Sequence, residues 1–209
     1  MLSIIPFRYL ALFTGVVVAI LLVLAFNVGR ATATPAPPSE VSADAGFARD
    51  MQTHHTQAVE MSMLILERST DPDIRSLAYD LALTQQQQNG QMFAWLRGWG
   101  LQQTSSGDSM AWMHASGHDT HDVANTQQKT TEPMPGLASA DDMDRLRKAT
   151  GQDADTIFLT LMISHHQGGI AMAEAAQQRA TTETVRTFTT KMIAAQTAEI
   201  TAMQKMLAG

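Results

Sequence analysis

The feature that most constrains this chain is a pair of adjacent histidines that occurs twice, each time with methionines around it. Residues 47–61 read FARDMQTHHTQAVEM and residues 158–172 read FLTLMISHHQGGIAM. A constant shift of 111 positions superimposes the two segments. The shift pairs Met51 with Met162, His54 with His165, His55 with His166 and Met61 with Met172. Any fold of this chain must therefore place one pattern of histidine and methionine twice.

The repeat extends through a whole helical hairpin. Apolar residues recur with helical spacing over 44–68 and 72–99, and Asp71-Pro72 between them is typical of a helix start. The same shift continues through this hairpin without a gap, so residues 153–207 are predicted to form a second one. Neither hairpin can bury its apolar stripe alone. The sequence therefore predicts an all-α, ferritin-like four-helix bundle made of two repeated hairpins.

An apolar segment precedes the repeat. Residues 10–28 carry no charge, and as a helix they would reach about 28 Å, close to the hydrocarbon thickness of a bilayer. The sequence thus predicts a single N-terminal transmembrane anchor or signal helix over residues 1–30 and a Pro-rich tether over residues 31–43. An uncleaved anchor is favoured, because the apolar part of a secretory signal is usually shorter. Either alternative places the rest of the chain outside the cytoplasm, on the periplasmic or cell-surface side, anchored in the plasma membrane or secreted if the signal is cleaved.

The predicted bundle covers residues 44–209. It divides into a first hairpin (44–99), a linker with a short helix (100–150) and a second hairpin (151–209). Ser139 and Asp142 form a capping-box pattern that predicts the short helix from about residue 140 to 150. The linker also carries a candidate metal site, consisting of Met110, Met113, His114, His118 and His121. A tract that captures metal and a merely polar linker both remain open interpretations.

Composition limits the chemistry. The net charge is −6 with acidic and basic residues interspersed, which is not the pattern of a nucleic-acid-binding surface. Cysteine is absent, so disulfides, thiolate ligands and cysteine nucleophiles are all excluded. A soft metal would have to be held by imidazole and methionine thioether. Methionine is plentiful at 14 residues, although it is also an ordinary core filler.

Helical spacing places the repeated residues on one face of each helix. The candidate metal ligands are Met51, His54, His55 and Met61 in the first copy and Met162, His165, His166 and Met172 in the second. Candidates to support those ligands from behind are Asp44, Asp155 and Glu199. Imidazole together with thioether suits copper, as Cu(I) or Cu(II), whereas zinc more often takes cysteine or carboxylate.

Three other interpretations compete. Taken singly, each methionine fits a packed core and each histidine a hydrogen-bonded one, so the chain could be a structural or interaction module without metal. A di-metal oxidase needs Glu-x-x-His on two helices, but Met51 and Met162 occupy the glutamate positions, which disfavours it. Haem binding is weaker still, because there is no Cys-x-x-Cys-His attachment. No catalytic constellation is visible, so the prediction is a protein that is not an enzyme.

The repeated pattern resembles a known bacterial family, the domain of unknown function 305. The matching stretches are DAGFARDMQTHHTQAVEM, DTIFLTLMISHHQGGIAM and, upstream of the second copy, MPGLASADDMDRLRKATG. The resemblance covers roughly residues 42–207. It implies a ferritin-like bundle exported beyond the plasma membrane, with copper binding and copper homeostasis in some members. The family signature falls on Asp44, Met51, His54, His55 and Met61, and on Asp155, Met162, His165, His166 and Met172.

The two copies differ in two places that bear on a site. Glu199 in the second hairpin corresponds to Gln88 in the first, so the first half lacks that charge. Gly168 and Gly169 lie inside a predicted helix, where each glycine costs up to about 1 kcal/mol of helix propensity. The combined prediction is a membrane-tethered bundle that sequesters or hands on copper. A copper-transfer partner and a homo-oligomer are both left open.

Overall fold

The computed structural model describes residues 7–32, 36–105, 107–114 and 134–208. Every regular element in these ranges is a helix, which confirms the all-α prediction. The helices are α1 (Phe7–Thr32), α2 (Ala43–Arg68), α3 (Pro72–Trp99), α4 (Ala111–His114), α5 (Ala140–Lys148), α6 (Gly151–Arg179) and α7 (Glu183–Ala208). The chain divides into two compact units, residues 1–37 and residues 38–209.

The first unit contains α1. This helix covers the apolar segment predicted from the sequence, and its large side chains, such as Phe13 and Phe26, are exposed. The prediction that it spans a membrane is not supported. Among the described residues, no helix has both the length and the apolar character needed to cross a bilayer.

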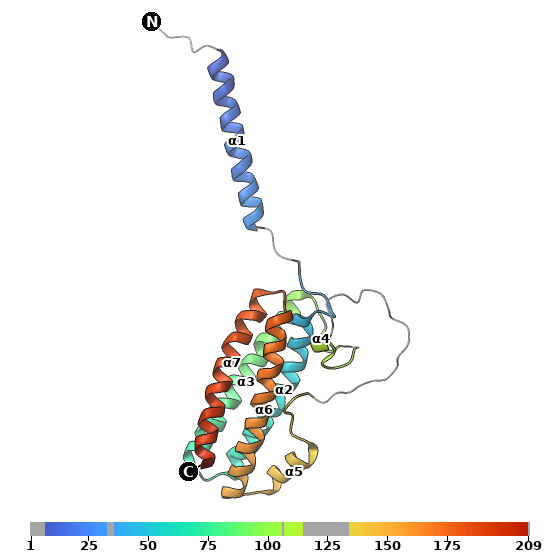
Figure 1. The fold of residues 1–209 in the computed structure, drawn as a ribbon, viewed down its shortest axis with the longest axis vertical. Coiled ribbons are helices and arrows are strands. Elements are labelled where there is room, and N and C mark those ends of the chain that lie inside the picture. Colours follow the sequence, from blue (N-terminus) through green and yellow to red (C-terminus); the bar gives the residue numbers. More distant parts are fainter. Residues whose placement is uncertain (1–6, 33–35, 106, 115–133, 209) are drawn as a thin grey trace. The chain divides into compact units, whose positions relative to one another are not determined.

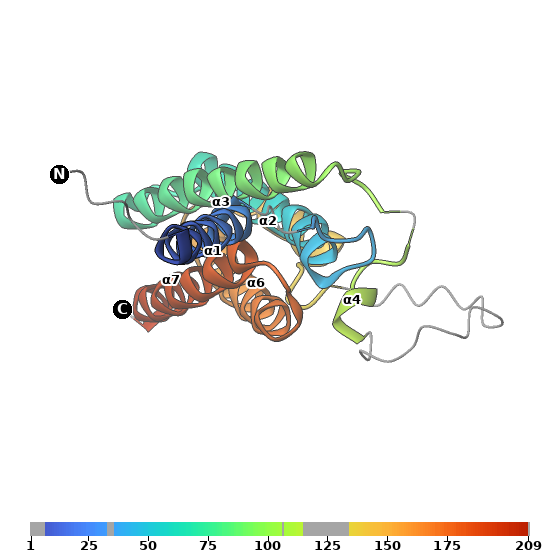
Figure 2. The same cartoon turned by 90° about the horizontal axis from the view of Figure 1, so that it is seen from above.

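The second unit is built from two hairpins that pack through their first helices. α2 pairs with α3, α6 pairs with α7, and α2 packs against α6. Figures 1 and 2 show the four helices of this bundle. Because α2 and α6 contact each other and each contacts one further helix, α3 and α7 are the outer pair. The shared α2–α6 interface therefore contains the repeated histidines of both hairpins.

The two central helices run antiparallel, and a buried carboxylate joins their ends. Asp44, in the first turn of α2, accepts hydrogen bonds from the backbone N–H groups of Thr181 and Thr182, both at 2.9 Å. The hydroxyl groups of the same two threonines also donate to it. These threonines follow the end of α6, so the start of α2 lies beside the end of α6. Burial alone would raise the pKa of Asp44, but the four donors outweigh it and hold the pKa below its ordinary value.

Local sequence signals set the helix ends. Ser42 caps α2, and Asp71 with Pro72 in the first turn begins α3. Ser139 and Asp142 form the predicted capping box of α5. That helix ends at Lys148, earlier than the sequence pattern predicted, because α6 begins directly afterwards at Gly151.

A polar layer divides the bundle core in two. The four repeated histidines are fully buried, and Gln85 on α3 and Gln196 on α7 are 2% and 3% exposed. One apolar cluster contains Met51, Met92, Met110, Met134, Met172 and Met192. The other contains Met61, Met143, Met162 and Met203. Polar groups in such a layer must find hydrogen-bond partners inside the protein, since water does not reach them.

A short strap, residues 134–138, crosses α2 and α6 at the level of the polar layer. Gln57 holds it through two hydrogen bonds with the backbone of Ala138, at 2.8 and 2.9 Å. A side chain at Gly168 would place its Cβ only 1.9 Å from the Pro135 carbonyl oxygen, and one at Gly136 would lie 2.3 Å from the Ser164 oxygen. Gly168, one of the two glycines that lower the helix propensity of α6, is therefore the residue that leaves room for the strap backbone.

We expect Gly168→Ala to destabilise the protein, because the added Cβ would collide with the strap backbone. The matched control is Gly90→Ala in α3, where an added Cβ meets nothing within 4 Å. This control should raise the free energy of unfolding by up to about 1 kcal/mol through helix propensity. Urea unfolding followed by circular dichroism measures both changes. A stabilising Gly168→Ala variant would contradict this account of the strap.

Candidate metal centre

The four histidines meet where α2 crosses α6. The rings of His54 and His165 face each other across the helix pair, with centroids 3.8 Å apart and planes 34° from parallel. His55 lies beside His54 at 6.4 Å between ring centroids, and His166 lies beside His165 at 6.2 Å. The fold therefore gathers both copies of the sequence motif into one cluster.

The two inner rings donate to backbone carbonyls. His54 Nε2 lies 3.0 Å from the carbonyl oxygen of Pro135 in the strap. His165 Nε2 lies 2.9 Å from the carbonyl oxygen of His54. A carbonyl oxygen can only accept a hydrogen bond, so the proton of each neutral ring is assigned to Nε2. The lone pair of each inner ring is consequently on Nδ1.

The two outer rings donate to side chains on the outer helices. His55 Nε2 lies 2.6 Å from Gln88 Oε1 on α3, and His166 Nε2 lies 2.9 Å from Glu199 Oε2 on α7. An amide oxygen and a carboxylate oxygen are again acceptors, so these protons are also on Nε2. All four imidazoles share one tautomer.

All four Nδ1 atoms are buried without a hydrogen-bond partner. Native proteins leave few such atoms, and each costs on the order of 1–3 kcal/mol if nothing satisfies it. A buried ring with one N–H donated to an oxygen and one free lone pair is the arrangement that orients a histidine to ligate a metal. The cluster therefore presents four oriented nitrogen donors.

Burial keeps the rings of His54, His55 and His165 neutral. It is the largest influence on the pKa of His54, which falls to about 4, and on that of His55, which falls to about 3. The hydrogen bonds to Pro135 and Gln88 oppose this shift only in part. Burial and the neighbouring imidazoles also lower the pKa of His165 well below its ordinary value. Metal ligation requires the neutral ring, so these nitrogens can bind a cation without first losing a proton.

Fully buried thioethers flank the imidazoles on both sides. Met51 and Met172 lie in one apolar cluster, and Met61 and Met162 lie in the other. Met51 precedes His54 by one helical turn, and Met162 precedes His165 in the same way. Each end of the histidine cluster thus has one methionine from α2 and one from α6.

The donor types select the kind of metal. Within the described residues, no three or more histidine, aspartate and glutamate side chains are grouped so that they could hold an ion together. The methionine thioethers beside these rings are donors of a different, softer kind. Imidazole and thioether donors suit soft ions such as Cu(I) rather than calcium, magnesium or a carboxylate-rich iron pair.

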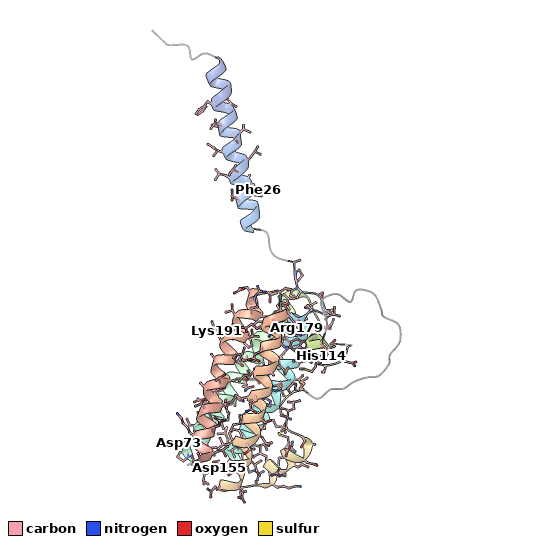
Figure 3. All side chains as sticks on the ribbon, in the orientation of Figure 1. Phe26, Asp73, His114, Asp155, Arg179 and Lys191 are labelled. Atoms are coloured by element: carbon pink, nitrogen blue, oxygen red, sulfur yellow. The ribbon has the colours of Figure 1, made fainter. Side chains whose placement is uncertain are left out.

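The three predicted supporting carboxylates behave differently. Glu199 does contact a candidate ligand, through its bond to His166. Asp44 and Asp155 do not, because every imidazole nitrogen either has another partner or has none. For these two residues the prediction is wrong: Asp44 links the helix ends, and Asp155 lies near the start of α6 (Figure 3). Asp44 lies in the first turn of α2 and Asp155 in the second turn of α6, both about ten residues before the histidines of the same helix.

The predicted linker site is divided by the structure. Met110 is buried and Met113 packs against the same apolar cluster as Met51. His114, at the end of α4, is exposed (Figure 3). His118 and His121 lie outside the described residues. Asp50 holds the start of this segment, accepting from the Met110 N–H at 2.8 Å and from Trp112 Nε1 at 2.8 Å.

Sequence reasoning missed several residues that shape the centre. The Pro135 carbonyl carries no sequence signal, since any residue has one. The sequence identifies Gln88 only as the uncharged counterpart of Glu199, and its hydrogen bond with His55 is not predicted from it. Gln85 and Gln196 correspond in the same way, and their buried amides include atoms without partners, namely Gln85 Oε1 and both polar atoms of Gln196.

These observations define a class of protein: a helical bundle whose two repeated hairpins enclose a layer of buried histidines between buried methionines. The chain belongs to the DUF305 family, a domain of unknown function, which matches residues 44–207. The resemblance seen in the sequence is thereby confirmed. No curated protein matches the chain.

Solved structures of the same family share the fold. A DUF305 protein from Streptomyces coelicolor, described as secreted, is 39% identical with a TM-score of 0.72, over 81% of this chain and 94% of that one. A DUF305 fragment from Deinococcus radiodurans is 30% identical with a TM-score of 0.63, over 84% and 99%. CopM in its Cu(I)-bound form is 25% identical with a TM-score of 0.55, over 78% and 93%.

We expect the metal-free protein to lose stability as the pH falls from about 6.5 toward about 4. The ordinary histidine pKa is 6.5, so the unfolded chain takes up protons in this range while folded His54 and His55 stay neutral. Each such ring lowers the free energy of unfolding by roughly 1.4 kcal/mol per pH unit. Urea unfolding across this pH range measures the slope.

The variant His55→Gln removes one of these buried titrating groups. It should flatten the pH dependence, whatever its effect on stability at neutral pH. Asp44 does not interfere, because a carboxyl with a lowered pKa loses its stabilising effect only below its ordinary value of 3.8. An unchanged slope in His55→Gln would argue against a neutral buried ring at this position.

Proposed function

We propose that this protein binds copper outside the cytoplasm and sequesters it or hands it on, without catalysing a reaction. The observation that carries the proposal is the set of four buried Nδ1 lone pairs, all without partners, between fully buried methionines. Such a set offers a soft ion imidazole nitrogen, with thioether sulfur beside it. In the empty protein the same set leaves a free-energy cost that an ion would relieve.

The donors divide into two half-sites related by the repeat. One combines the first histidine pair with Met51 of α2 and Met172 of α6, which share an apolar cluster. The other combines the second pair with Met162 of α6 and Met61 of α2. Thioether favours Cu(I) over Cu(II), so we assign the reduced ion as the preferred cargo.

Two comparisons support the proposal. CopM, which has the same fold, has been solved with Cu(I) bound. The relative from Streptomyces coelicolor is described as secreted, which supports a location outside the cytoplasm. In such a compartment thiols oxidise, and the absence of cysteine from this chain suits a soft-metal site built without them.

Removal of thioether should weaken Cu(I) binding while the fold is kept. We expect Met51→Leu combined with Met162→Leu to lower Cu(I) affinity at least about tenfold, a change of about 1.4 kcal/mol. The substitution conserves side-chain volume and is well tolerated in cores. Competition with a chromophoric Cu(I) chelator measures the affinity. The control is Met63→Leu on the same helix, where the side chain is 54% exposed and affinity should not change.

The imidazoles provide the stronger test. Replacement of His54, His55, His165 and His166 by alanine should abolish tight binding of Cu(I). Weak binding by the wild type, or affinity unchanged by this replacement, would contradict the proposal and favour a module whose histidines serve packing alone.

The acceptors behind the outer rings should tune affinity in opposite directions. Glu199→Gln removes the negative charge that polarises His166, and we expect Cu(I) affinity to fall by about 10- to 100-fold. Gln88→Glu adds the equivalent charge behind His55 and should raise affinity. The two changes are isosteric and reciprocal. If both variants bind as the wild type does, the outer histidines are not ligands.

A further inference from the structure

The outer helices are less closely packed on each other than on the inner helices. α3 and α7 pack closely on α2 and α6 respectively, and they meet each other through Trp95 and Phe188, whose ring centroids are 5.0 Å apart. In Figure 2 they lie at opposite edges of the bundle. Between them is a cleft of about 570 Å³, lined on the α3 side by residues including Gln88, Gln91 and Trp95. On the α7 side its lining includes Lys191, Met192 and Ala195.

The inner end of this cleft touches the candidate metal centre. Gln88, a partly buried lining residue, accepts the hydrogen bond from His55. Met192, another lining residue, is only 1% exposed and belongs to the apolar cluster of Met51 and Met172. An ion in the cleft would therefore be next to an amide oxygen that holds one imidazole and next to a thioether of the sulfur-rich cluster.

Unpartnered amides continue from the cleft into the core. Gln85 lies one turn before Gln88 on α3, and Gln196 lies one turn after Met192 on α7. Both side chains are at least nine-tenths buried, and Gln85 Oε1 and both polar atoms of Gln196 have no partner. Gly169 leaves the space that Gln196 occupies, since a Cβ there would be 2.7 Å from Gln196 Oε1. Each buried polar atom without a partner requires an explanation, and a cation that passes close to it would provide one.

On one side of the described bundle, the strap covers the imidazoles. The strap covers His54 with the Pro135 carbonyl and packs directly on Gly168. All four rings are fully buried, and the inner pair is bonded only to backbone oxygens. The outer pair is bonded to Gln88, which is partly exposed, and to Glu199, whose side chain is 26% exposed. Among the described hydrogen-bond partners of the imidazoles, the partly exposed side chains therefore lie on α3 and α7.

We propose that the cleft between α3 and α7 is the route by which a soft monovalent ion, Cu(I) or Ag(I), reaches and leaves the histidine layer. This inference rests on the copper-binding function proposed above. The ion passes Gln88 and Met192, and the buried amides of Gln85 and Gln196 replace part of its hydration. The cleft thereby controls the rate of exchange, while the imidazoles and methionines inside determine the affinity.

Bulk in the cleft should slow exchange and leave affinity unchanged. Ala195 lines the cleft and is exposed, so Ala195→Phe narrows the route without entering the core. We expect severalfold slower release of Cu(I), measured by stopped flow as the loaded full chain gives Cu(I) to excess chromophoric chelator. Loading should slow by the same factor, because the affinity is unchanged. The matched control is Ala194→Phe on the neighbouring exposed position, which does not line the cleft and should keep wild-type rates. Gln91→Phe tests the opposite wall independently.

Charge in the cleft gives a second readout. Lys191 lines it on α7 (Figure 3), so Lys191→Glu should accelerate cation loading severalfold at low ionic strength, and salt should remove the gain. Lys205→Glu, elsewhere on α7, makes the same change in net charge and should have little effect. The route through the cleft would be overturned, and the copper-binding function kept, if tight Cu(I) binding is retained and three variants exchange Cu(I) at wild-type rates: Ala195→Phe, Gln91→Phe and Lys191→Glu. Failure of the wild type to bind Cu(I) would overturn the function and the route together.

Discussion

The structure depends on one constraint, the burial of four imidazoles in the middle of an α-helical core. Each ring must place its N–H on an acceptor, because an unsatisfied polar group in such a place is costly. The acceptors come from four different parts of the chain: the strap, the backbone of α2, and side chains on α3 and α7. Because each buried ring needs an acceptor for its N–H, the hydrogen bonds of the four histidines connect the strap, both hairpins and the α2–α6 crossing.

The repeat produces a nearly symmetric framework with unequal halves. His55 donates to the amide of Gln88, whereas its counterpart His166 donates to the carboxylate of Glu199. His54 takes the Pro135 carbonyl of a strap that has no equivalent in the other half, and Gly168 makes the room for that strap. Two half-sites with the same donors therefore differ in charge and in the groups that surround them.

The chemistry follows from burial together with donor type. Desolvation keeps the rings of His54, His55 and His165 uncharged. Hydrogen bonds to oxygen acceptors place the N–H of each of the four rings on Nε2, and the Nδ1 atoms have no hydrogen-bond partner. Methionines packed on both sides add sulfur and exclude water. A layer with these properties favours a weakly hydrated, polarizable cation over a hard one. The cleft between α3 and α7 is the route that we propose for such a cation.

The sequence by itself determined the helices, the hairpin repeat and the set of candidate donors, because helical periodicity and the 111-residue shift are properties of the linear pattern. It also pointed to Glu199, through the contrast with Gln88. It could not assign Asp44 and Asp155 correctly, nor reveal the Pro135 carbonyl or the cleft. Those features depend on which segments lie together in space. The partner of a buried nitrogen and the gap between two outer helices arise from contacts between residues far apart along the chain, and only the tertiary structure decides them.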